Sequence, residues 1–228
     1  MDDITVIFPT ANKIPEYFAA NVRKYLLDSI GDTPLISVSK EPMDFGQNIV
    51  FEGEQGHMAQ YRETLEAVKL AKTKYIALTE DDTLYVPQHF KRRPSRPDVF
   101  AYNTACWSFY MWSDPPIFSY SGRRNNNVLI CERDLYIEAM EERFAKYPNP
   151  KDQDKRYWVE PGKYEKQLGV TIRNTEIFYS DPACIMVSHQ WGNSFGGLGT
   201  RKRLGPIRAY EIPYWGRAED VMKLVKKP

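Results

Sequence analysis

The sequence predicts an α/β protein with a mostly parallel, doubly wound sheet flanked by helices. Short apolar runs rich in β-branched residues alternate with longer segments in which apolar residues recur at helical spacing. Such alternation is typical of strand–helix–strand units, whose strands pair in parallel. The 228 residues suit one large domain, and because no linker divides them we expect a single domain over 1–228.

The alternation is clearest before Pro87. Four short apolar runs are expected to form strands, over 4–8, 35–38, 49–51 and 75–79. Two longer segments with an apolar stripe are expected to form helices, over 15–30 and 57–71. Gly31 should end the first helix, because glycine readily adopts the left-handed conformation that often follows a helix.

After Pro87 the pattern changes to aromatic strands with fewer helices. Strands are expected over 99–112, 128–131, 177–179 and 184–187. Helices are expected over 132–147 and 161–168, the second with proline at the favoured first position. Loops are expected over 91–97 and 149–155, and a weakly structured tail, rich in glycine and basic residues, over 192–228.

The composition excludes several classes of protein. The net charge is +1, so the chain as a whole has no attraction to nucleic acid or anionic lipid. Three cysteines without paired spacing argue against a disulfide framework or a zinc site, and favour a reducing compartment. The N-terminus does not look like a signal peptide, and no window reaches the ~18 apolar residues of a membrane helix. We therefore expect a cytoplasmic protein, or one of the host cytoplasm if it is viral, without a membrane span.

Three carboxylates directly follow the strand expected over 75–79: Glu80, Asp81 and Asp82. Ligands of α/β proteins bind at the carboxyl ends of parallel strands. Adjacent carboxylates repel one another unless a cation or a hydrogen-bonding ligand lies among them. Their hard oxygen atoms suit Mg²⁺ or Mn²⁺, which in turn carries phosphate. The pattern favours a metal and phosphate site, the alternative being a solvated acidic turn.

The segment around these carboxylates resembles the strand and metal-binding acidic motif of GT-A-fold glycosyltransferases, especially the family-2-like group: TKYIALTEDDTLYVP. The resemblance implies a GT-A-type fold, with a twisted, mostly parallel sheet and a smaller β region on the acceptor side. It implies that Asp82 holds Mn²⁺ or Mg²⁺ on the donor diphosphate. Asp81 or Glu80 would contact the ribose or the water shell of the metal, and Asp81 is the second candidate metal ligand. Residues 1–87 would form the nucleotide-binding half and 88–228 the acceptor-binding half.

Three further segments resemble the nucleotide-binding part of this family. The first, ITVIFPTANK, is similar to its first strand and turn, which implies three nucleotide-binding residues: Pro9, Thr10 and Asn12. The second, LISVSKEP, stands where the family often has an aspartate on uracil, and this chain offers Ser39 or Glu41 there. The third, EQGHMAQYRETLEAVKLAKTKY, resembles the helix that leads into the acidic motif, with Arg62 one position later than the family's arginine.

The second half contains two more similar segments. RYWVEPGKYEKQLG resembles the catalytic carboxylate segment of the family, which makes Glu160 the candidate general base and Glu165 the alternative. Because Glu160 would stand at a helix start, the helix dipole should favour its ionised form, which can act as a general base. The alternative is that Glu160 is an acidic residue with only a structural role at the N-terminus of the helix. TEIFYSDPACIMVSHQWGNSFGG resembles the closing strand of the family and a late histidine, so His189 is the third candidate metal ligand.

Basic segments add two candidate functions. Arg201 and Lys202 follow the glycine-rich stretch 192–199, and a mobile loop there could clamp a diphosphate, as a late loop often does in this family. The segment KRRPSRP, the residues 122–124 and the aromatic stretch 107–120 could face nucleic acid. The alternatives are a solvated basic tail and aromatic core packing.

These observations lead to a functional hypothesis. We expect a metal-dependent hexosyl- or pentosyltransferase that moves a sugar from a nucleotide-diphosphate donor, UDP in the first instance, to an acceptor hydroxyl with inversion. Three classes of acceptor stay open: a glycan, a small molecule, and a hydroxymethylated DNA base as in phage-type DNA-modifying enzymes. The alternatives are a non-catalytic nucleotide-binding module and a nucleotidyltransferase using the same acidic crevice. The oligomeric state stays open.

Overall fold

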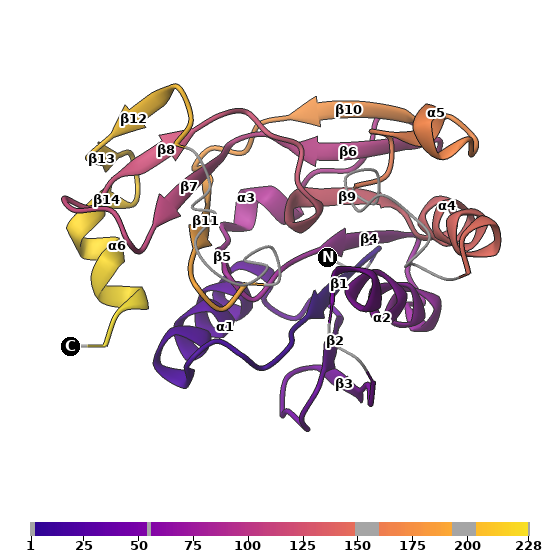
Figure 1. The fold of residues 1–228 in the computed structure, drawn as a ribbon, viewed down its shortest axis with the longest axis horizontal. Coiled ribbons are helices and arrows are strands. Elements are labelled where there is room, and N and C mark those ends of the chain that lie inside the picture. The colour runs from indigo at the N-terminus through magenta and orange to yellow at the C-terminus, as the bar shows by residue number, and fades with distance from the viewer. Residues whose placement is uncertain (1–2, 54–55, 149–159, 193–203, 228) are drawn as a thin grey trace.

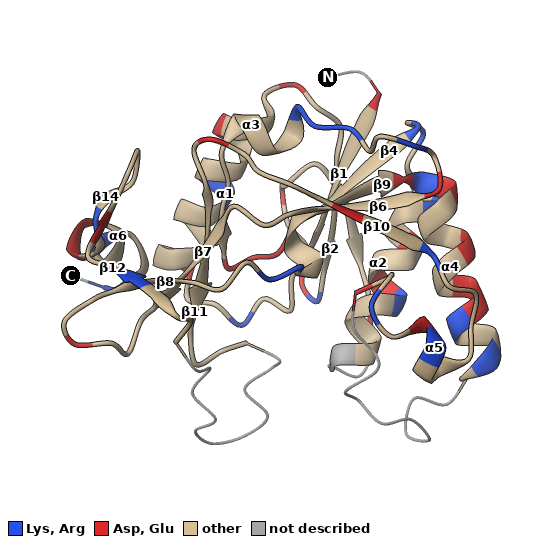
Figure 2. Cartoon of the chain, turned by 90° about the horizontal axis from the view of Figure 1, so that it is seen from above, with Lys and Arg blue, Asp and Glu red and all other residues tan. Residues whose placement is uncertain are grey.

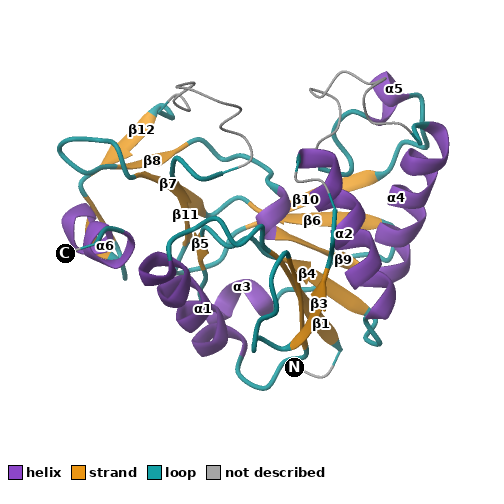
Figure 3. Cartoon of the chain, turned by 60° about the horizontal axis from the view of Figure 1, so that its bottom comes forward, coloured by secondary structure: helices purple, strands orange, loops and turns teal. Residues whose placement is uncertain are grey.

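The computed structural model describes residues 3–53, 56–148, 160–192 and 204–227. Within these residues the strands form a seven-stranded sheet, a five-stranded sheet and a two-stranded ribbon. Figure 1 shows the two larger sheets side by side, with helices packed around them. Figure 3 shows the five-stranded sheet next to α6 (Ala218–Val225), and the seven-stranded sheet next to α2 (His57–Leu70) and α4 (Arg133–Lys146).

The seven-stranded sheet has the order β10-β6-β9-β4-β1-β2-β3. Its strands in chain order are β1 (Ile4–Pro9), β2 (Leu35–Ser39), β3 (Gln47–Val50), β4 (Tyr75–Leu78), β6 (Val99–Asn103), β9 (Leu129–Glu132) and β10 (Asn174–Phe178). Parallel pairs join β1 to β2 and β4, β2 to β3, and β6 to β10. Among the described strands of this sheet, β9 alone runs antiparallel to its neighbours, which are β4 and β6. The expected α/β class with a mostly parallel sheet is confirmed.

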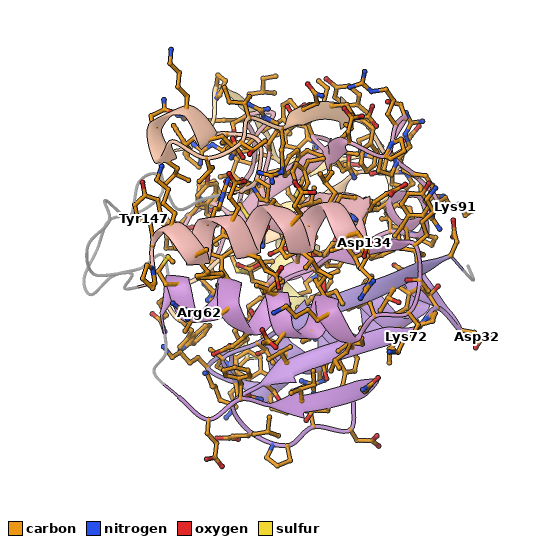
Figure 4. The ribbon with its side chains drawn as sticks, turned by 90° about the vertical axis from the view of Figure 1, so that its right-hand side faces the viewer. Asp32, Arg62, Lys72, Lys91, Asp134 and Tyr147 are labelled. Atoms are coloured by element: carbon orange, nitrogen blue, oxygen red, sulfur yellow. The ribbon has the colours of Figure 1, made fainter. Side chains whose placement is uncertain are left out.

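Helices cover both faces of this sheet. On one face α2 and α4 pack side by side, as Figure 4 shows. On the other face lies α1 (Glu16–Ile30), which contacts α6 and the short helix α3 (Pro87–Phe90). Side chains alternate between the faces along β1, since Val6 and Phe8 pack in the core cluster of α1 whereas Ile7 packs in that of α2.

Local sequence explains α1 well. Its buried apolar residues recur every four positions, which places them on one stripe: Phe18, Val22, Leu26 and Ile30. Gly31 follows with a φ of 55°, and its backbone N–H donates to the Leu27 carbonyl. Because a side chain disfavours this left-handed conformation, glycine is well suited to end the helix.

The five-stranded sheet has the order β12-β8-β7-β11-β5. Its strands in chain order are β5 (Thr83–Leu84), β7 (Cys106–Tyr110), β8 (Phe118–Tyr120), β11 (Cys184–Ser188) and β12 (Ile207–Ala209). The aromatic stretch contributes to its core, since Tyr110 and Phe118 are 2% and 0% exposed. The pairing of β11 with β5 matters most for function, because it places the residue after β11 beside the acidic triplet before β5.

Several expected elements differ from the structure. The strand expected over 99–112 is interrupted between β6 and β7, and the helix expected over 161–168 begins only with α5 (Glu165–Leu168). The loop expected over 149–155 lies outside the described residues. Several short elements were not expected, among them β5, α3, β8 and the 3₁₀-helix Asn126–Val128.

The expectation of a weakly structured tail is wrong for 204–227. Two strands, β13 (Glu211–Ile212) and β14 (Gly216–Arg217), form a ribbon before α6. The buried residues of α6 recur at helical spacing and pack toward α1: Ala218, Val221, Met222 and Val225. The overall glycine and lysine content conceals this short amphipathic stripe, whose burial stabilises the helix.

All three cysteines are buried with free thiols: Cys106, Cys131 and Cys184. Burial raises the pKa of each thiol above its ordinary value, so the thiols are held in the neutral form.

None of the helices in the described ranges has the length and apolar character that a bilayer crossing demands.

Candidate functional site

A cavity of about 220 Å³ lies at the carboxyl ends of β1 and β4. Residues from several separate segments line it, among them Pro9 and Thr10 from β1 and its turn, Glu80 to Asp82 after β4, Asn125 to Asn127 before β9, Glu160 before α5, and His189 after β11. In α/β proteins this edge of the sheet is the usual ligand position. The fold therefore brings together candidate residues that are far apart in the sequence.

Thr10 and Asp81 join the two central strands at this edge. The Thr10 hydroxyl donates a 2.5 Å hydrogen bond to Asp81 Oδ2. Partial burial, and the charge of neighbouring Asp82, raise the pKa of Asp81 from 3.8 to about 6, while the bond from Thr10 acts in the opposite direction. The Asp81 carboxylate is thus poorly compensated by the protein alone, as expected for a group that meets a cation.

Asp82 is held by groups on both of its carboxylate oxygens. Thr83 Oγ1 donates to Oδ1 at 3.1 Å, and His189 Nε2 lies 3.5 Å from Oδ2. The β11–β5 pairing creates this contact, since the Val187 amide donates to the Asp82 carbonyl at 2.7 Å. His189 is almost fully buried, with 3% of its surface exposed.

The hydrogen bonds of His189 define its tautomer. The backbone N–H of Trp191 donates to His189 Nδ1 at 3.1 Å, so Nδ1 has no hydrogen. A neutral imidazole in this arrangement carries its hydrogen on Nε2, the atom that faces Asp82. An Nε2 with a hydrogen has no lone pair for a metal. In this arrangement the hydrogen of His189 Nε2 faces Asp82, and the role of His189 as a metal ligand, which the resemblance implies, stays a prediction.

The donor set fits a metal ion that is shared with phosphates. Within the described ranges, no group of three or more His, Cys, Asp or Glu side chains is arranged to hold a metal. Mg²⁺ keeps several waters and is commonly bound through one or two carboxylates plus substrate phosphates. Asp81 and Asp82 supply such a partial set, and a cation would relieve the repulsion that raises the pKa of Asp81.

The structure separates the two candidate general bases. Glu160 lines the cavity, and its Oε2 lies 2.8 Å from Lys163 Nζ. It does not stand at a helix start, because α5 begins at Glu165, so an ion pair with Lys163 replaces the expected helix dipole. Glu165 is 4% exposed and forms a 2.9 Å ion pair with buried Arg143, outside both described cavities. Glu165 therefore supports the segment rather than facing a ligand.

A second cavity, of about 250 Å³, adjoins the first and shares Thr10 and Asp81 with it. Asn12 and Glu41 line this cavity. The Asn12 side chain accepts hydrogen bonds from the amides of Lys40 and Glu41, at 2.7 and 3.2 Å, which joins the turn after β1 to the end of β2. Asn12 has a φ of 54°, a left-handed conformation that asparagine adopts more readily than most residues.

Two other candidates lie elsewhere. Ser39 is fully buried, and its hydroxyl donates to the Glu41 carbonyl at 2.7 Å, so it holds the turn together. Arg62 lies on the outer side of α2, labelled in Figure 4, with its guanidinium over the Phe144 ring and a 2.6 Å hydrogen bond to the Pro148 carbonyl. Neither residue lines the two cavities.

The loop candidates and the basic segments give no further site residues. Arg201, Lys202 and most of the glycine-rich stretch lie outside the described residues. In the segment KRRPSRP, Arg93 forms a 2.5 Å ion pair with Asp3. Among the residues 122–124, Arg124 donates a 2.6 Å hydrogen bond to Thr175. Figure 2 shows acidic and basic residues interspersed along α4. Because these basic side chains are paired with neighbouring groups of the protein, they do not favour a surface that binds nucleic acid.

Sequence reasoning missed two groups in the main cavity. Lys40 Nζ forms an ion pair with Glu63 and donates to the Phe51 carbonyl at 3.2 Å, and both charged side chains are largely buried. No sequence signal links Lys40 to Glu63, which are 23 positions apart. The second group is the run of three asparagines at 125–127. A polar run directly before an apolar strand was a usable signal, but only the direction of β9 brings it to the site.

Several solved structures are similar in fold. The glycosyltransferase GlyE of Streptococcus pneumoniae aligns with 78% of this chain and 45% of its own, at 10% identity and a TM-score of 0.49. A glycosyltransferase involved in glycosylation of the major capsid of PBCV-1 aligns with 80% of this chain and 92% of its own, at 13% identity and a TM-score of 0.43. The bifunctional IspDF of Campylobacter jejuni aligns with 78% of this chain and 50% of its own, at 10% identity and a TM-score of 0.43.

The chain spans about half the length of the IspDF and GlyE chains. These likenesses concern the arrangement of strands and helices. No protein-family model matches the sequence, and no curated protein matches it either. Evidence on function therefore comes from the geometry of the cavity.

Proposed function

We propose that the protein is a metal-dependent glycosyltransferase, which moves a sugar from a nucleoside-diphosphate donor to an acceptor hydroxyl. The observation that carries the proposal is the joint placement of Asp81, Asp82 and Glu160 in one cavity at the carboxyl edge of the parallel sheet. In this proposal Asp81 and Asp82 would meet a cation and Glu160 would transfer a proton, and the three carboxylates line the same space.

The donor would lie along the carboxyl ends of the central strands. Its nucleoside would contact the turn after β1, through Pro9, Thr10 and Asn12, and the residue Glu41 after β2. Asp82, with Asp81 beside it, would hold Mn²⁺ or Mg²⁺, which when bound neutralises charge on the departing diphosphate. His189 and Thr83 keep the Asp82 carboxylate in one orientation.

Glu160 would act as the general base. Its carboxylate takes the proton of the acceptor hydroxyl while that oxygen forms a bond to the anomeric carbon of the donor. The bond from this carbon to the diphosphate breaks, and the nucleoside diphosphate leaves with the electron pair. A single displacement of this kind inverts the anomeric centre, which NMR of the product would reveal.

Calorimetry with UDP, GDP and their sugar conjugates, with and without Mn²⁺, tests the proposal. We expect Mn²⁺-dependent binding to the wild type and at least about a tenfold loss for Asp82→Asn. The matched control is Asp28→Asn, because Asp28 is an exposed carboxylate on α1. Absence of nucleotide binding, or equal binding by both variants, contradicts the proposal.

Products separate the competing functions. A glycosyltransferase releases the nucleoside diphosphate, a nucleotidyltransferase releases pyrophosphate, and a binding module releases neither. The acceptor can be assigned by offering three classes with the donor that binds: oligosaccharides, small hydroxylated molecules, and DNA containing hydroxymethylated bases. Transfer to DNA together with salt-dependent binding would support the DNA-modifying version.

A further inference from the structure

The loop before β9 places two unsatisfied polar groups at the main cavity. Asn126 and Asn127 both line this cavity and are 8% and 0% exposed. The side-chain Oδ1 of each is buried and has no hydrogen-bond partner among the described residues. A buried acceptor without a partner destabilises the folded protein, so such atoms are uncommon in native proteins and call for a specific explanation.

The loop itself is held firmly. Tyr85 Oη donates to the Asn127 carbonyl at 2.7 Å and accepts from the Glu80 amide at 3.0 Å. Asn127 Nδ2 donates to Thr83 Oγ1 at 2.7 Å, and the same Thr83 hydroxyl donates to Asp82. The unpartnered oxygens therefore belong to a loop that hydrogen bonds hold at Asn127.

The loop also connects the two proposed functional carboxylates. Through Thr83, Asn127 reaches Asp82, the proposed partner of the metal on the diphosphate. At the other end, the carbonyl of Arg124 accepts a hydrogen bond from Lys163, which forms the ion pair with Glu160. In the proposed reaction the transferred sugar lies between the diphosphate and the base, so it lies beside this loop.

The chemistry of the free atoms selects the ligand group. An amide oxygen accepts hydrogen bonds and cannot donate them, so it does not match a phosphate oxygen, which is also an acceptor. A sugar hydroxyl supplies the missing donor. We infer that Asn126 and Asn127 recognise hydroxyl groups of the transferred sugar and so determine donor specificity. This inference rests on the proposed function.

Asn126 is the better residue to test, because Asn127 also holds Thr83. The experiment measures calorimetric Kd values with Mn²⁺ for UDP and GDP, and for UDP-glucose, UDP-galactose, UDP-N-acetylglucosamine and GDP-mannose. For Asn126→Leu we expect an unchanged Kd for the free nucleotide and about a tenfold weaker Kd for the preferred sugar conjugate. The control Asn174→Leu, on the exposed edge strand β10, should change neither.

Deoxy analogues of the preferred donor complete the test. The analogue that lacks the recognised hydroxyl should bind the wild type about tenfold more weakly than the full donor does. Asn126→Leu should bind this analogue and the full donor with the same Kd. The inference is overturned if the variant weakens free nucleotide and conjugate equally, or weakens neither. If the wild type binds none of the six compounds, the proposed function itself has failed, which is a distinct result.

Discussion

The Thr10 hydroxyl and the Asp81 carboxylate connect the ends of β1 and β4 through a 2.5 Å hydrogen bond, although the residues are 71 positions apart. This bond stabilises the ionised form of a carboxyl whose pKa is raised by partial burial and by the charge of Asp82. The balance between these effects determines how much negative charge the cavity presents to a ligand.

Replacement of Thr10 by valine should destabilise the protein in a pH-dependent way. Asp81 has a folded pKa of about 6 against 3.8 ordinarily, so its titration lowers stability as the pH rises between these values. The bond from Thr10 offsets part of this loss when Asp81 is ionised. We expect Thr10→Val to lower the free energy of unfolding by about 1–2 kcal/mol near pH 8, and by less near pH 5.

Urea denaturation at both pH values measures this difference. Thr10→Ser is the matched control, because serine keeps the hydroxyl and should stay near the wild type. If Thr10→Val lowers the free energy of unfolding by the same amount at both pH values, the hydroxyl does not act through the Asp81 charge.

Glu160 and Glu165 should respond differently to the same substitution. Glu160→Gln should reduce transfer by about 100-fold or more, without change in nucleotide Kd, because only proton transfer is lost. Glu165→Gln should instead lower the free energy of unfolding by about 3 kcal/mol, because it leaves buried Arg143 without its charge partner. Turnover assays and denaturation curves on both variants distinguish the two roles. Exchanged phenotypes would refute the assignment of Glu160.

His189 should act on Asp82 without binding the metal. We expect the electron paramagnetic resonance of the Mn²⁺–UDP complex to show no difference between protein with ordinary histidine and protein with ¹⁵N-labelled histidine. The chain has only three histidines, so the label is selective. A nitrogen coupling that changes with the label would identify a histidine ligand and reject the donor role. In the same assay, His189→Gln, which can still donate near Asp82, should retain Mn²⁺ binding better than His189→Leu.

His89 should contribute to acid sensitivity. It is fully buried among aromatic rings, accepts a 3.2 Å hydrogen bond from Asn103 at Nδ1, and has its pKa lowered by burial from 6.5 to about 3. The unfolded chain takes up a proton here below about pH 6.5 whereas the folded chain does not, so stability falls as the pH decreases toward 3. The expected slope is about 1.4 kcal/mol per pH unit.

His89→Phe tests this by removing the titrating group while keeping an aromatic ring. The free energy of unfolding of this variant, measured from about pH 7 to pH 4, should fall less steeply than that of the wild type. Parallel curves for the two proteins would assign the acid sensitivity to other groups.

Local periodicity was sufficient for the first half of the chain. The strands β1, β2 and β4 and the helices α1 and α2 follow from apolar spacing and from Gly31, since these signals depend only on neighbouring residues. Short elements such as β5 and α6 were missed, because two to eight residues give too little pattern unless their packing partners are known. The same limit applies to α5, where proline suggested a helix start four residues too early.

The sequence by itself determined the α/β class and the position of the acidic residues after β4. The tertiary structure alone decided which residues share the cavity. The β11–β5 pairing brings His189 to Asp82, and the antiparallel direction of β9 brings Asn126 and Asn127 to the end of β4. It also placed Glu160 in the cavity and Glu165 in a buried ion pair, although the two have the same chemistry. The physical reason is that periodicity is a local property, whereas strand order and burial depend on contacts between distant segments.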